Sequence, residues 1–114
     1  LGYKKNPFKY LKQADILILT SIFEGSPNVL VEAQYLKKFV ISTDCPTGPK
    51  EILNNGEYGK LVNLYDYKLI SKIIDNFVLN RNNMRKINLA YKQLGKYDYK
   101  KNCLAYFNLI KKYL

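Results

Sequence analysis

"SIFEGSPNVLVEA", residues 21–33, combines a glycine, a proline and two glutamates next to an apolar run. It follows "ADILILT", residues 14–20, a nearly continuous apolar run that is typical of a strand buried on both faces of a parallel sheet. Within the stretch, Ser26 is a favourable N-cap and Pro27 suits the first position of a helix, so we expect a helix over residues 27–38. Residues 21–33 therefore predict the turn from a buried strand into a helix.

Two more strands are expected downstream. "FVIST", residues 39–43, is rich in β-branched and aromatic residues, and "GKLVNL", residues 59–64, follows turn-forming residues. Between them, "GPKEILNNG", residues 48–56, predicts a short helix ended by Asn55 and Gly56. This alternation of strands and helices predicts parallel pairing with right-handed crossovers.

The remainder of the chain is expected to be helical. Its apolar residues recur with helical spacing in three stripes: Leu69, Ile70, Ile73, Ile74, Phe77 and Val78; Met84, Ile87, Tyr91 and Leu94; and Cys103, Tyr106, Phe107, Ile110 and Leu114. The segments 80–83 and 95–98 separate the stripes. We expect one partial domain over residues 1–114, in which residues 1–64 form a strand–helix half and residues 65–114 form the C-terminal helices.

The N-terminal segment "LGYKKNP", residues 1–7, has the character of the tail of a further strand with its exit loop. Three parallel strands are few for a sheet that is normally covered on both faces, and the chain begins at Leu1 rather than at Met. We therefore expect the later half of a doubly wound, Rossmann-like α/β domain from a longer protein.

Composition argues against several kinds of site. The 114 residues include no histidine, and Cys45 and Cys103 share no motif spacing, so we expect no zinc site and two reduced thiols. No apolar run reaches the roughly 18 residues that a membrane helix needs. A cytoplasmic protein is the expectation that follows.

The net charge of +10 is concentrated near the C-terminus. Residues 81–114 hold nine Lys or Arg residues against one acid, Asp98, whereas residues 1–80 hold ten Lys residues against eight acids. A basic region of this kind is a solvated face, a surface for an anionic membrane, or a nucleic-acid contact. Because no nucleic-acid-binding motif accompanies the charge, the first two alternatives are favoured and no nucleic-acid partner is expected.

The turn after residues 14–20 lies where ligands bind in open α/β sheets, at the carboxyl end of a strand. We expect free backbone N–H groups at Asn28, Val29 and Leu30, at the positive end of the helix dipole, where they suit a pyrophosphate. Gly25 would let such a ligand approach the backbone closely. The sequence therefore predicts an anion site at this helix end.

Two carboxylates, Glu24 and Glu32, flank the expected anion site. Helical spacing places Glu32 about 60° from the centre of the buried face, at its border. Carboxylates repel a phosphate but accept hydrogen bonds from hydroxyl groups on either side of it, which a nucleotide-sugar offers. The alternative is that Glu24 is a solvated loop residue and that Glu32 pairs with a lysine at the border of the core.

Three segments around these carboxylates resemble one enzyme family. Residues 21–34, "SIFEGSPNVLVEAQ", resemble the E-x7-E signature of retaining GT-B glycosyltransferases of group 1, also called family 4. Residues 40–62, "VISTDCPTGPKEILNNGEYGKLV", and residues 2–21, "GYKKNPFKYLKQADILILTS", resemble the segments that flank this signature. The resemblance covers about residues 1–75, and it implies the later half of the C-terminal, donor-binding GT-B domain.

Two details qualify the resemblance. The Asp-Cys-Pro-x-Gly-Pro-x-Glu variant at residues 44–51 is most similar to bacterial enzymes that add hexose or N-acetylhexosamine units to lipid-linked or surface glycans. At residues 37–38, two lysines precede Phe39 where most relatives have a small residue and Gly. That loop departs from the family pattern.

The resemblance implies a role for each residue of the turn. Glu24 would be the catalytic residue that contacts hydroxyls of the donor sugar, and Glu32 would hold the ribose hydroxyls. The implied donor-binding residues are Ser21, Phe23, Glu24, Gly25, Ser26, Asn28, Val29, Leu30 and Glu32. Thr47, Gly48 and Glu51 either contact donor or acceptor in the same crevice, or form a tight turn with a favourable helix-end charge.

The resemblance also implies a reaction and its partners. It implies a two-domain enzyme that transfers a hexose or N-acetylhexosamine from a UDP-linked donor with retention, without a metal or other cofactor. The Arg and Lys that such enzymes place against the diphosphate, and the N-terminal acceptor domain, match no part of this chain. The fragment alone is therefore expected to be inactive, and the enzyme to work in the cytoplasm or at the inner face of a membrane.

The alternative function is a non-catalytic remnant. Residues 15–20, as an unpaired apolar strand at a sheet edge, would then mediate self-association as a homodimer. Instead of self-association, such a remnant could use its basic helices to dock on an anionic membrane surface.

Overall fold

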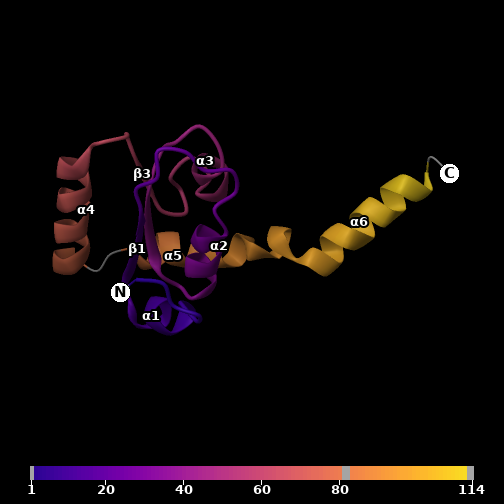
Figure 1. The fold of residues 1–114 in the computed structure, drawn as a ribbon, viewed down its shortest axis with the longest axis horizontal. Helices are drawn as coiled ribbons and strands as arrows, with labels where there is room; N and C mark the ends of the chain where they lie inside the picture. Colours follow the sequence, from indigo (N-terminus) through magenta and orange to yellow (C-terminus); the bar gives the residue numbers. More distant parts are fainter. Residues whose placement is uncertain (1, 81–82, 113–114) are drawn as a thin grey trace.

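The computed structural model describes residues 2–80 and 83–112 as one mixed α/β unit with an extended C-terminal helix (Figure 1). Its elements are α1 (Phe8–Gln13), β1 (Ile16–Leu19), α2 (Asn28–Tyr35), β2 (Phe39–Thr43), α3 (Pro49–Ile52), β3 (Lys60–Val62), α4 (Tyr67–Asn80), α5 (Met84–Lys92), the 3-10 helix η1 (Gln93–Tyr97) and α6 (Tyr99–Lys111). All three expected strands are present, although β1 and β3 are shorter than the apolar runs that predicted them.

The strands form one parallel sheet with the order β1-β2-β3. Ile18 of β1 is in register with Ile41 of β2, and Thr43 of β2 is in register with Val62 of β3. All five residues of β2 are buried, because this central strand is paired along both edges and covered on both faces. The expected α/β class, with three parallel strands and flanking helices, is confirmed.

Two apolar cores cover the two faces of the sheet, and helices from different parts of the chain build them (Figure 1). One core consists of Leu30, Ala33, Val40, Ile52 and Leu53. The other consists of Phe39, Ile41, Val62 and Ile87, against which Ile70, Ile73, Ile74 and Phe77 of α4 pack. The alternation of Phe39, Val40 and Ile41 between these cores follows from the two-residue period of a strand. Phe39 stacks on Phe77 with 5.1 Å between ring centroids.

Helix α2 ends at Tyr35, three residues earlier than the sequence predicts. Lys37 takes a left-handed conformation, with φ of 55°, and the N–H of Lys38 donates to the carbonyl of Ala33 at 2.9 Å. This is the geometry of a Schellman helix end, in which glycine is usual at the left-handed position. The Lys37 ammonium lies 4.7 Å from the centre of the Tyr91 ring, a cation–π contact that helps to offset the backbone strain.

The N-terminal expectation of a strand tail is wrong for the part that the structure describes. Residues 2–7 form no strand, and the chain enters α1 directly after Pro7. This segment is exposed and contains no apolar run that could fill a sheet position. Leu1 lies outside the described residues.

Helix α6 projects away from the body of the molecule (Figure 1) and buries none of its residues. Its N-cap is Asp98, whose carboxylate accepts hydrogen bonds from the N–H groups of Lys100 and Lys101 at 2.9 and 3.2 Å. The third apolar stripe of the sequence therefore forms an exposed face instead of core, and Leu114 lies outside the described residues. The second stripe is also only partly buried, because Ile87 is in the core whereas Met84 is exposed.

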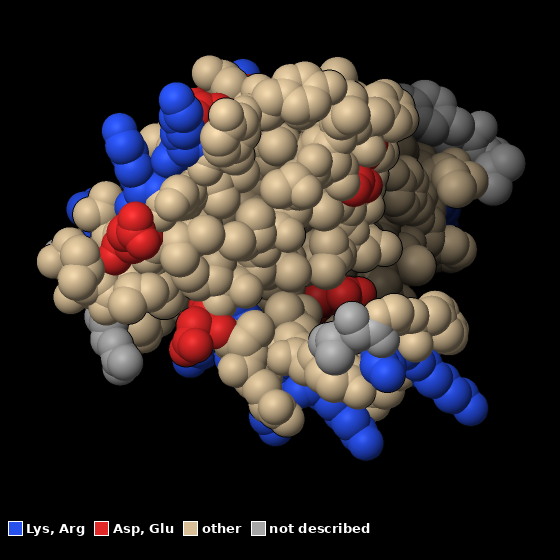
Figure 2. Space-filling model, turned by 60° about the vertical axis from the view of Figure 1, so that its left-hand side comes forward, with Lys and Arg blue, Asp and Glu red and all other residues tan. Residues whose placement is uncertain are grey.

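Lysine and arginine side chains project mainly at the margins of the face shown in Figure 2, whose middle is covered by uncharged residues. The half-buried side chain of Lys86 instead holds a turn of the backbone. Lys86 on α5 donates to the carbonyls of Gly56 and Glu57 at 2.6 and 3.3 Å, in the turn before β3. Burial, together with the nearby positive charge of Lys60, lowers the pKa of Lys86 below its usual value.

Within the described residues, no helix has both the length and the apolar character needed to cross a membrane.

Replacing Phe39 should destabilise the whole unit. We expect Phe39→Ala to lower the free energy of unfolding by about 3–5 kcal/mol, because it empties a buried site and removes the stacking partner of Phe77. The matched control is Phe107→Ala, since Phe107 on α6 is 63% exposed and should cost less than about 1 kcal/mol. Urea denaturation followed by circular dichroism measures both, and equal losses would contradict the placement of the core.

Candidate functional site

Two loops leave the sheet at the same edge, because β1 and β2 are parallel neighbours. We define the Glu24 loop as residues 20–27, between β1 and α2, and the Gly48 loop as residues 44–48, between β2 and α3. Both begin at the carboxyl ends of their strands, where α/β proteins bind ligands. The candidate site is therefore built from these two loops and the helix that follows the first.

The Glu24 carboxylate is held by its own loop. The Ser21 hydroxyl donates to Oε1 of Glu24 at 2.6 Å, and both side chains are half-buried. A hydrogen bond to an ionised carboxylate is stronger than one between neutral groups, and it restricts the rotamers of the carboxylate. Glu24 is thus half-buried, and a hydrogen bond inside its own loop orients its carboxylate.

Two threonines fasten the same loop to its neighbour. The hydroxyl of Thr43, the last residue of β2, donates to the Ser21 carbonyl at 2.5 Å. The hydroxyl of Thr47, in the Gly48 loop, donates to the Glu24 carbonyl. The loop is therefore held at the carbonyls of both Ser21 and Glu24, by the last residue of β2 and by a residue of the loop after β2.

Gly48 permits the two loops to touch. It has φ of 89°, and a Cβ built on it would lie 2.6 Å from the Gly25 carbonyl oxygen and 2.5 Å from Cδ of Pro27. Both the conformation and the space exclude a side chain. Gly25 differs, because a Cβ built there meets no atom within 4 Å, so its surface is open to a ligand.

The start of α2 corrects two expectations. The N-cap is Pro27, with φ of −72° and ψ of 91° and no side-chain hydrogen bond, so the assignment of Ser26 as N-cap is wrong. The buried Pro27 ring packs toward Gly48, which fixes the helix start one residue later than predicted. The N–H of Leu30 donates to the Pro27 carbonyl at 3.0 Å and is not free for a ligand. The N–H groups of Asn28 and Val29 come before the first hydrogen bond inside the helix. We therefore still expect them to donate to a bound anion.

Glu32 lies on α2 at the border of the core, as its helical position predicts. It lines an apolar hollow of about 420 Å³ beside the outer edge of β1, together with Ile18 and Val29. It also lines a second hollow of about 610 Å³, toward Tyr35 and Tyr97. Glu24 lines neither of these two hollows, so neither of them joins the two carboxylates.

The remaining predicted residues divide by exposure. Phe23, Gly25, Ser26 and Asn28 are exposed, and Phe23 is 72% exposed. Thr47, Gly48 and Glu51 line one hollow of about 480 Å³ with Lys50, whose ammonium lies 3.5 Å from the Asp44 carboxylate. Buried Cys45 and exposed Cys103 are both free thiols. Within residues 2–80 and 83–112, no cluster of three or more His, Cys, Asp or Glu side chains could hold a metal.

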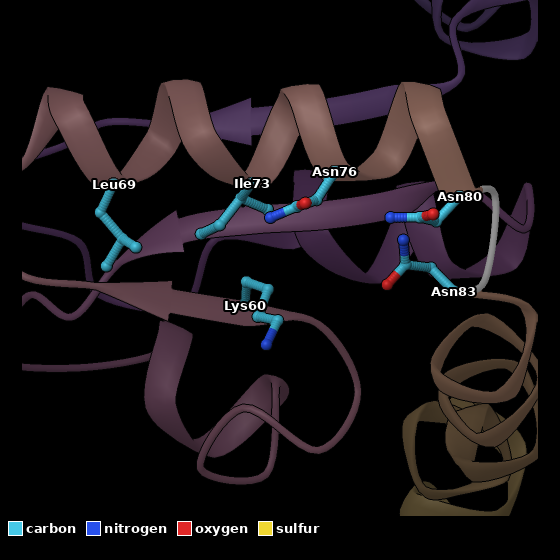
Figure 3. Close-up of a pocket in the computed structure, with 6 residues that line it drawn as sticks. All are labelled: Lys60, Leu69, Ile73, Asn76, Asn80 and Asn83. Carbon is cyan, nitrogen blue, oxygen red and sulfur yellow. The ribbon is translucent and has the colours of Figure 1, made fainter.

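A further hollow of about 540 Å³ lies away from these loops, between α4 and β3 (Figure 3). Asn76 and Asn80 project into it from α4, Asn83 from the start of α5, and Lys60 from β3. It contains no residue of the Glu24 or Gly48 loops, so it is separate from the candidate site.

Sequence reasoning missed Thr43 as a residue that supports the candidate site. Its hydroxyl reaches across to the Ser21 carbonyl, but its place in the buried run "FVIST" makes it look like a core position. A polar residue at the carboxyl end of a parallel strand is the signal that could have identified it.

Comparisons with known proteins identify the family to which this chain is similar. Residues 1–100 match the family model described as glycosyl transferases group 1. Over 53 residues the chain is 55% identical to an uncharacterized glycosyltransferase of Methanocaldococcus jannaschii, a match that covers 46% of this chain and 13% of that protein. Over 62 residues it is 37% identical to N-acetylgalactosamine-N,N'-diacetylbacillosaminyl-diphospho-undecaprenol 4-alpha-N-acetylgalactosaminyltransferase of Campylobacter jejuni, covering 54% of this chain and 17% of that protein.

A third relative is matched over most of this chain. The probable sucrose-phosphate synthase of Thermosipho melanesiensis is 35% identical over 104 residues, which are 89% of this chain and 23% of that protein. The chain thus spans less than a quarter of the length of each of these relatives. Among solved structures, the crystal structure of TarM, a GT-B glycosyltransferase, matches with a TM-score of 0.79 at 23% identity, covering 94% of this chain and 22% of TarM. This likeness confirms the expected GT-B type of fold.

The contact between the two loops can be tested with a pair of glycine variants. We expect Gly48→Ala to lower the free energy of unfolding by about 1–3 kcal/mol, because alanine is strained at this φ and its Cβ meets the Gly25 carbonyl. Gly25→Ala is the matched control and should cost less than about 1 kcal/mol, since its Cβ meets open space. Thermal unfolding compares the two. Equal stability of both variants would mean that the loops do not touch in solution.

Proposed function

This chain belongs to the group 1 glycosyl transferases, and from this premise we propose that it is the donor-binding part of an enzyme that transfers a sugar from a nucleotide diphosphate sugar. In this proposal the sugar is a hexose or an N-acetylhexosamine, the donor is UDP-linked, and transfer to a glycan or lipid-linked acceptor occurs with retention. The acceptor is held by a domain outside these 114 residues, so the fragment alone does not turn over.

One observation carries the proposal: an oriented carboxylate lies at the carboxyl end of β1, immediately before the start of α2. Ser21 fixes the Glu24 carboxylate at 2.6 Å, four residues before the first residue of the helix, Asn28. A carboxylate that is held in this way can accept hydrogen bonds from sugar hydroxyls, while unbonded N–H groups at a helix start favour phosphate oxygens. A sugar linked to a diphosphate offers these two kinds of group side by side.

Each part of the donor then has a partner in the chain. Glu24 accepts hydrogen bonds from the donor sugar's hydroxyls and holds the anomeric carbon in position for the acceptor. The N–H groups of Asn28 and Val29 bind phosphate oxygens, and the open surface at Gly25 admits the diphosphate close to the backbone. Glu32 accepts the ribose hydroxyls, and the apolar hollow beside it, with Ile18 and Val29, leaves space for the base. Backbone groups instead of a metal ion or other cofactor carry the diphosphate in this scheme.

The relatives support the choice of sugar and acceptor class. The Campylobacter jejuni relative is named for transfer of N-acetylgalactosamine to a diphospho-undecaprenol-linked glycan, and its matched 62 residues contain 37% identities. A lipid-linked acceptor of that kind would place the enzyme at a membrane surface, where its soluble donor is also available.

A second candidate function, docking on an anionic membrane, is favoured by α6. This helix is exposed along its whole length and carries Leu104, Phe107 and Ile110 beside lysines. Basic helices with exposed aromatic and aliphatic residues bind in the interface of anionic bilayers. Such docking is compatible with sugar transfer to a lipid-linked acceptor, and it would also serve a chain without catalytic activity.

The donor-site proposal is tested by two glutamates in the full-length protein. We expect Glu24→Gln to lower kcat/KM by roughly 10- to 100-fold, because a charged hydrogen-bond acceptor for the sugar is lost. Glu32→Gln should mainly raise KM for the UDP-sugar. Release of UDP from UDP-N-acetylgalactosamine, UDP-N-acetylglucosamine and UDP-glucose measures both effects.

The matched control is Glu57→Gln, since Glu57 lies in the turn before β3 and is paired with Asn54. It should leave kcat and KM unchanged. Wild-type activity in both Glu24→Gln and Glu32→Gln would refute the proposed roles.

Membrane docking by α6 is tested by flotation with vesicles. We expect the protein to float with vesicles of phosphatidylserine and phosphatidylcholine and not with phosphatidylcholine alone. Each lysine near an anionic surface contributes about 1 kcal/mol, so Lys100→Glu with Lys101→Glu should abolish flotation. Lys4→Glu with Lys5→Glu makes the same change of charge away from α6 and should float normally. Equal flotation of all three proteins would exclude α6 as the docking element.

A further inference from the structure

The Glu24 loop has little backbone support of its own. Among the described residues, no backbone–backbone hydrogen bond outside the regular elements involves residues 21–26. Loops normally satisfy their backbone groups by such bonds, by side chains or by water. Three side-chain hydroxyls hold this loop instead. Ser21 donates to the Glu24 carboxylate, and Thr43 and Thr47 donate to the carbonyls of Ser21 and Glu24.

The Gly48 loop, in contrast, is anchored to the sheet and to α3. The N–H of Asp44 donates to the Val62 carbonyl of β3 at 2.8 Å, and the Gly48 carbonyl accepts from the N–H of Ile52 at 2.9 Å. Cys45 and Pro49 are buried on either side of Thr47. Thr47 therefore projects its hydroxyl from a firmly held segment toward a weakly held one.

From this asymmetry we propose that Thr47 is a positioning residue for Glu24, which acts through the loop backbone and not on the substrate. Its hydroxyl is committed to the Glu24 carbonyl, and Gly48 beside it sets the contact between the loops. Thr47 fixes the backbone of Glu24, and the Ser21 hydroxyl fixes its carboxylate. The two contacts together keep the carboxylate in one orientation. The inference rests on the proposed role of Glu24, and it assigns to Thr47 a task other than lining a crevice.

The chemistry of Thr47 separates this task from a purely structural one. Because its side chain is exposed, water can replace the lost hydrogen bond in a valine variant, and the fold should remain intact. Water cannot restore the orientation of the Glu24 carboxylate in the same way. Displacement of a catalytic group by about 1 Å can lower the rate by up to roughly 100-fold. The loss should therefore appear in kcat and not in stability or in KM.

The test compares Thr47→Val with Thr47→Ser in the full-length protein. We expect Thr47→Val to lower kcat for UDP release by roughly ten-fold, with KM for the same UDP-sugar changed less than about three-fold. Thr47→Ser keeps the hydroxyl and should retain at least about half of the wild-type kcat. A second readout needs no substrate: the NMR order parameter of the Gly25 amide should fall from about 0.85 to below about 0.6 in Thr47→Val only.

Each outcome separates the positioning role from the donor-site proposal. Unchanged kcat in Thr47→Val, with Glu24→Gln impaired, would overturn the positioning role and leave the donor site standing. Equal losses in Thr47→Val and Thr47→Ser would also overturn it, because the hydroxyl would not be the group that matters. Full activity of Glu24→Gln would overturn the donor-site proposal itself, and the Gly25 order parameter would then still decide whether Thr47 holds the loop.

Discussion

The structure depends on β2, the central strand, because among the strands of residues 2–80 and 83–112 it alone is paired on both edges, and all of its residues are buried. Its alternating side chains divide between two cores, Val40 on one face and Phe39 with Ile41 on the other. Each core recruits helices from a different part of the sequence, so the strand ties the N-terminal half to α4 and α5. The same pairing sets the carboxyl ends of β1 and β2 side by side, which is what brings the two loops of the candidate site together.

The site divides into a supporting loop and a presenting loop. The Gly48 loop is anchored by hydrogen bonds to β3 and α3, and the Glu24 loop is held to β2 by Thr43 and to the Gly48 loop by Thr47. Among the described residues, residues 21–26 make no backbone–backbone hydrogen bond outside the regular elements, and of their carbonyls those of Ser21 and Glu24 accept from threonine hydroxyls. A loop that is held by its neighbour and open on its outer side is suited to binding a flexible, charged molecule such as a nucleotide-sugar. A supporting second layer of this kind is what a functional group needs if it is to be held in a productive geometry.

Most strands and helices could be predicted from the sequence, because residues buried in a strand or a helix recur with a regular spacing. The run "FVIST" gave β2 with the observed bounds, and the segment from Leu69 to Val78 gave α4 with Ile70, Ile73 and Phe77 facing the core. The turn at Glu24 and the helix after it were also predicted. Hydrophobic pattern and local turn chemistry suffice for such features, since they depend on neighbours in the sequence.

The features that were missed depend on residues far apart in the chain. The end of α2 at Tyr35 relies on Lys37 in a left-handed conformation, with the Tyr91 ring beneath its ammonium. The N-cap is Pro27 and not the predicted Ser26, because the proline packs toward Gly48. Rules based on neighbouring residues cannot predict a contact between residues 21 positions apart. The apolar stripe of α6 predicted a buried face, yet periodicity only shows that a helix is amphipathic and does not identify what covers it.

We propose that the donor diphosphate lies at the start of α2, between Glu24 and Glu32. The most direct measurement is a crystal structure of the full-length protein with bound UDP-N-acetylgalactosamine. We expect phosphate oxygens within hydrogen-bond distance of the N–H groups of Asn28 or Val29, the sugar against Glu24 and the ribose against Glu32. A nucleotide bound away from this helix, for example in the hollow between α4 and β3 (Figure 3), would contradict the account.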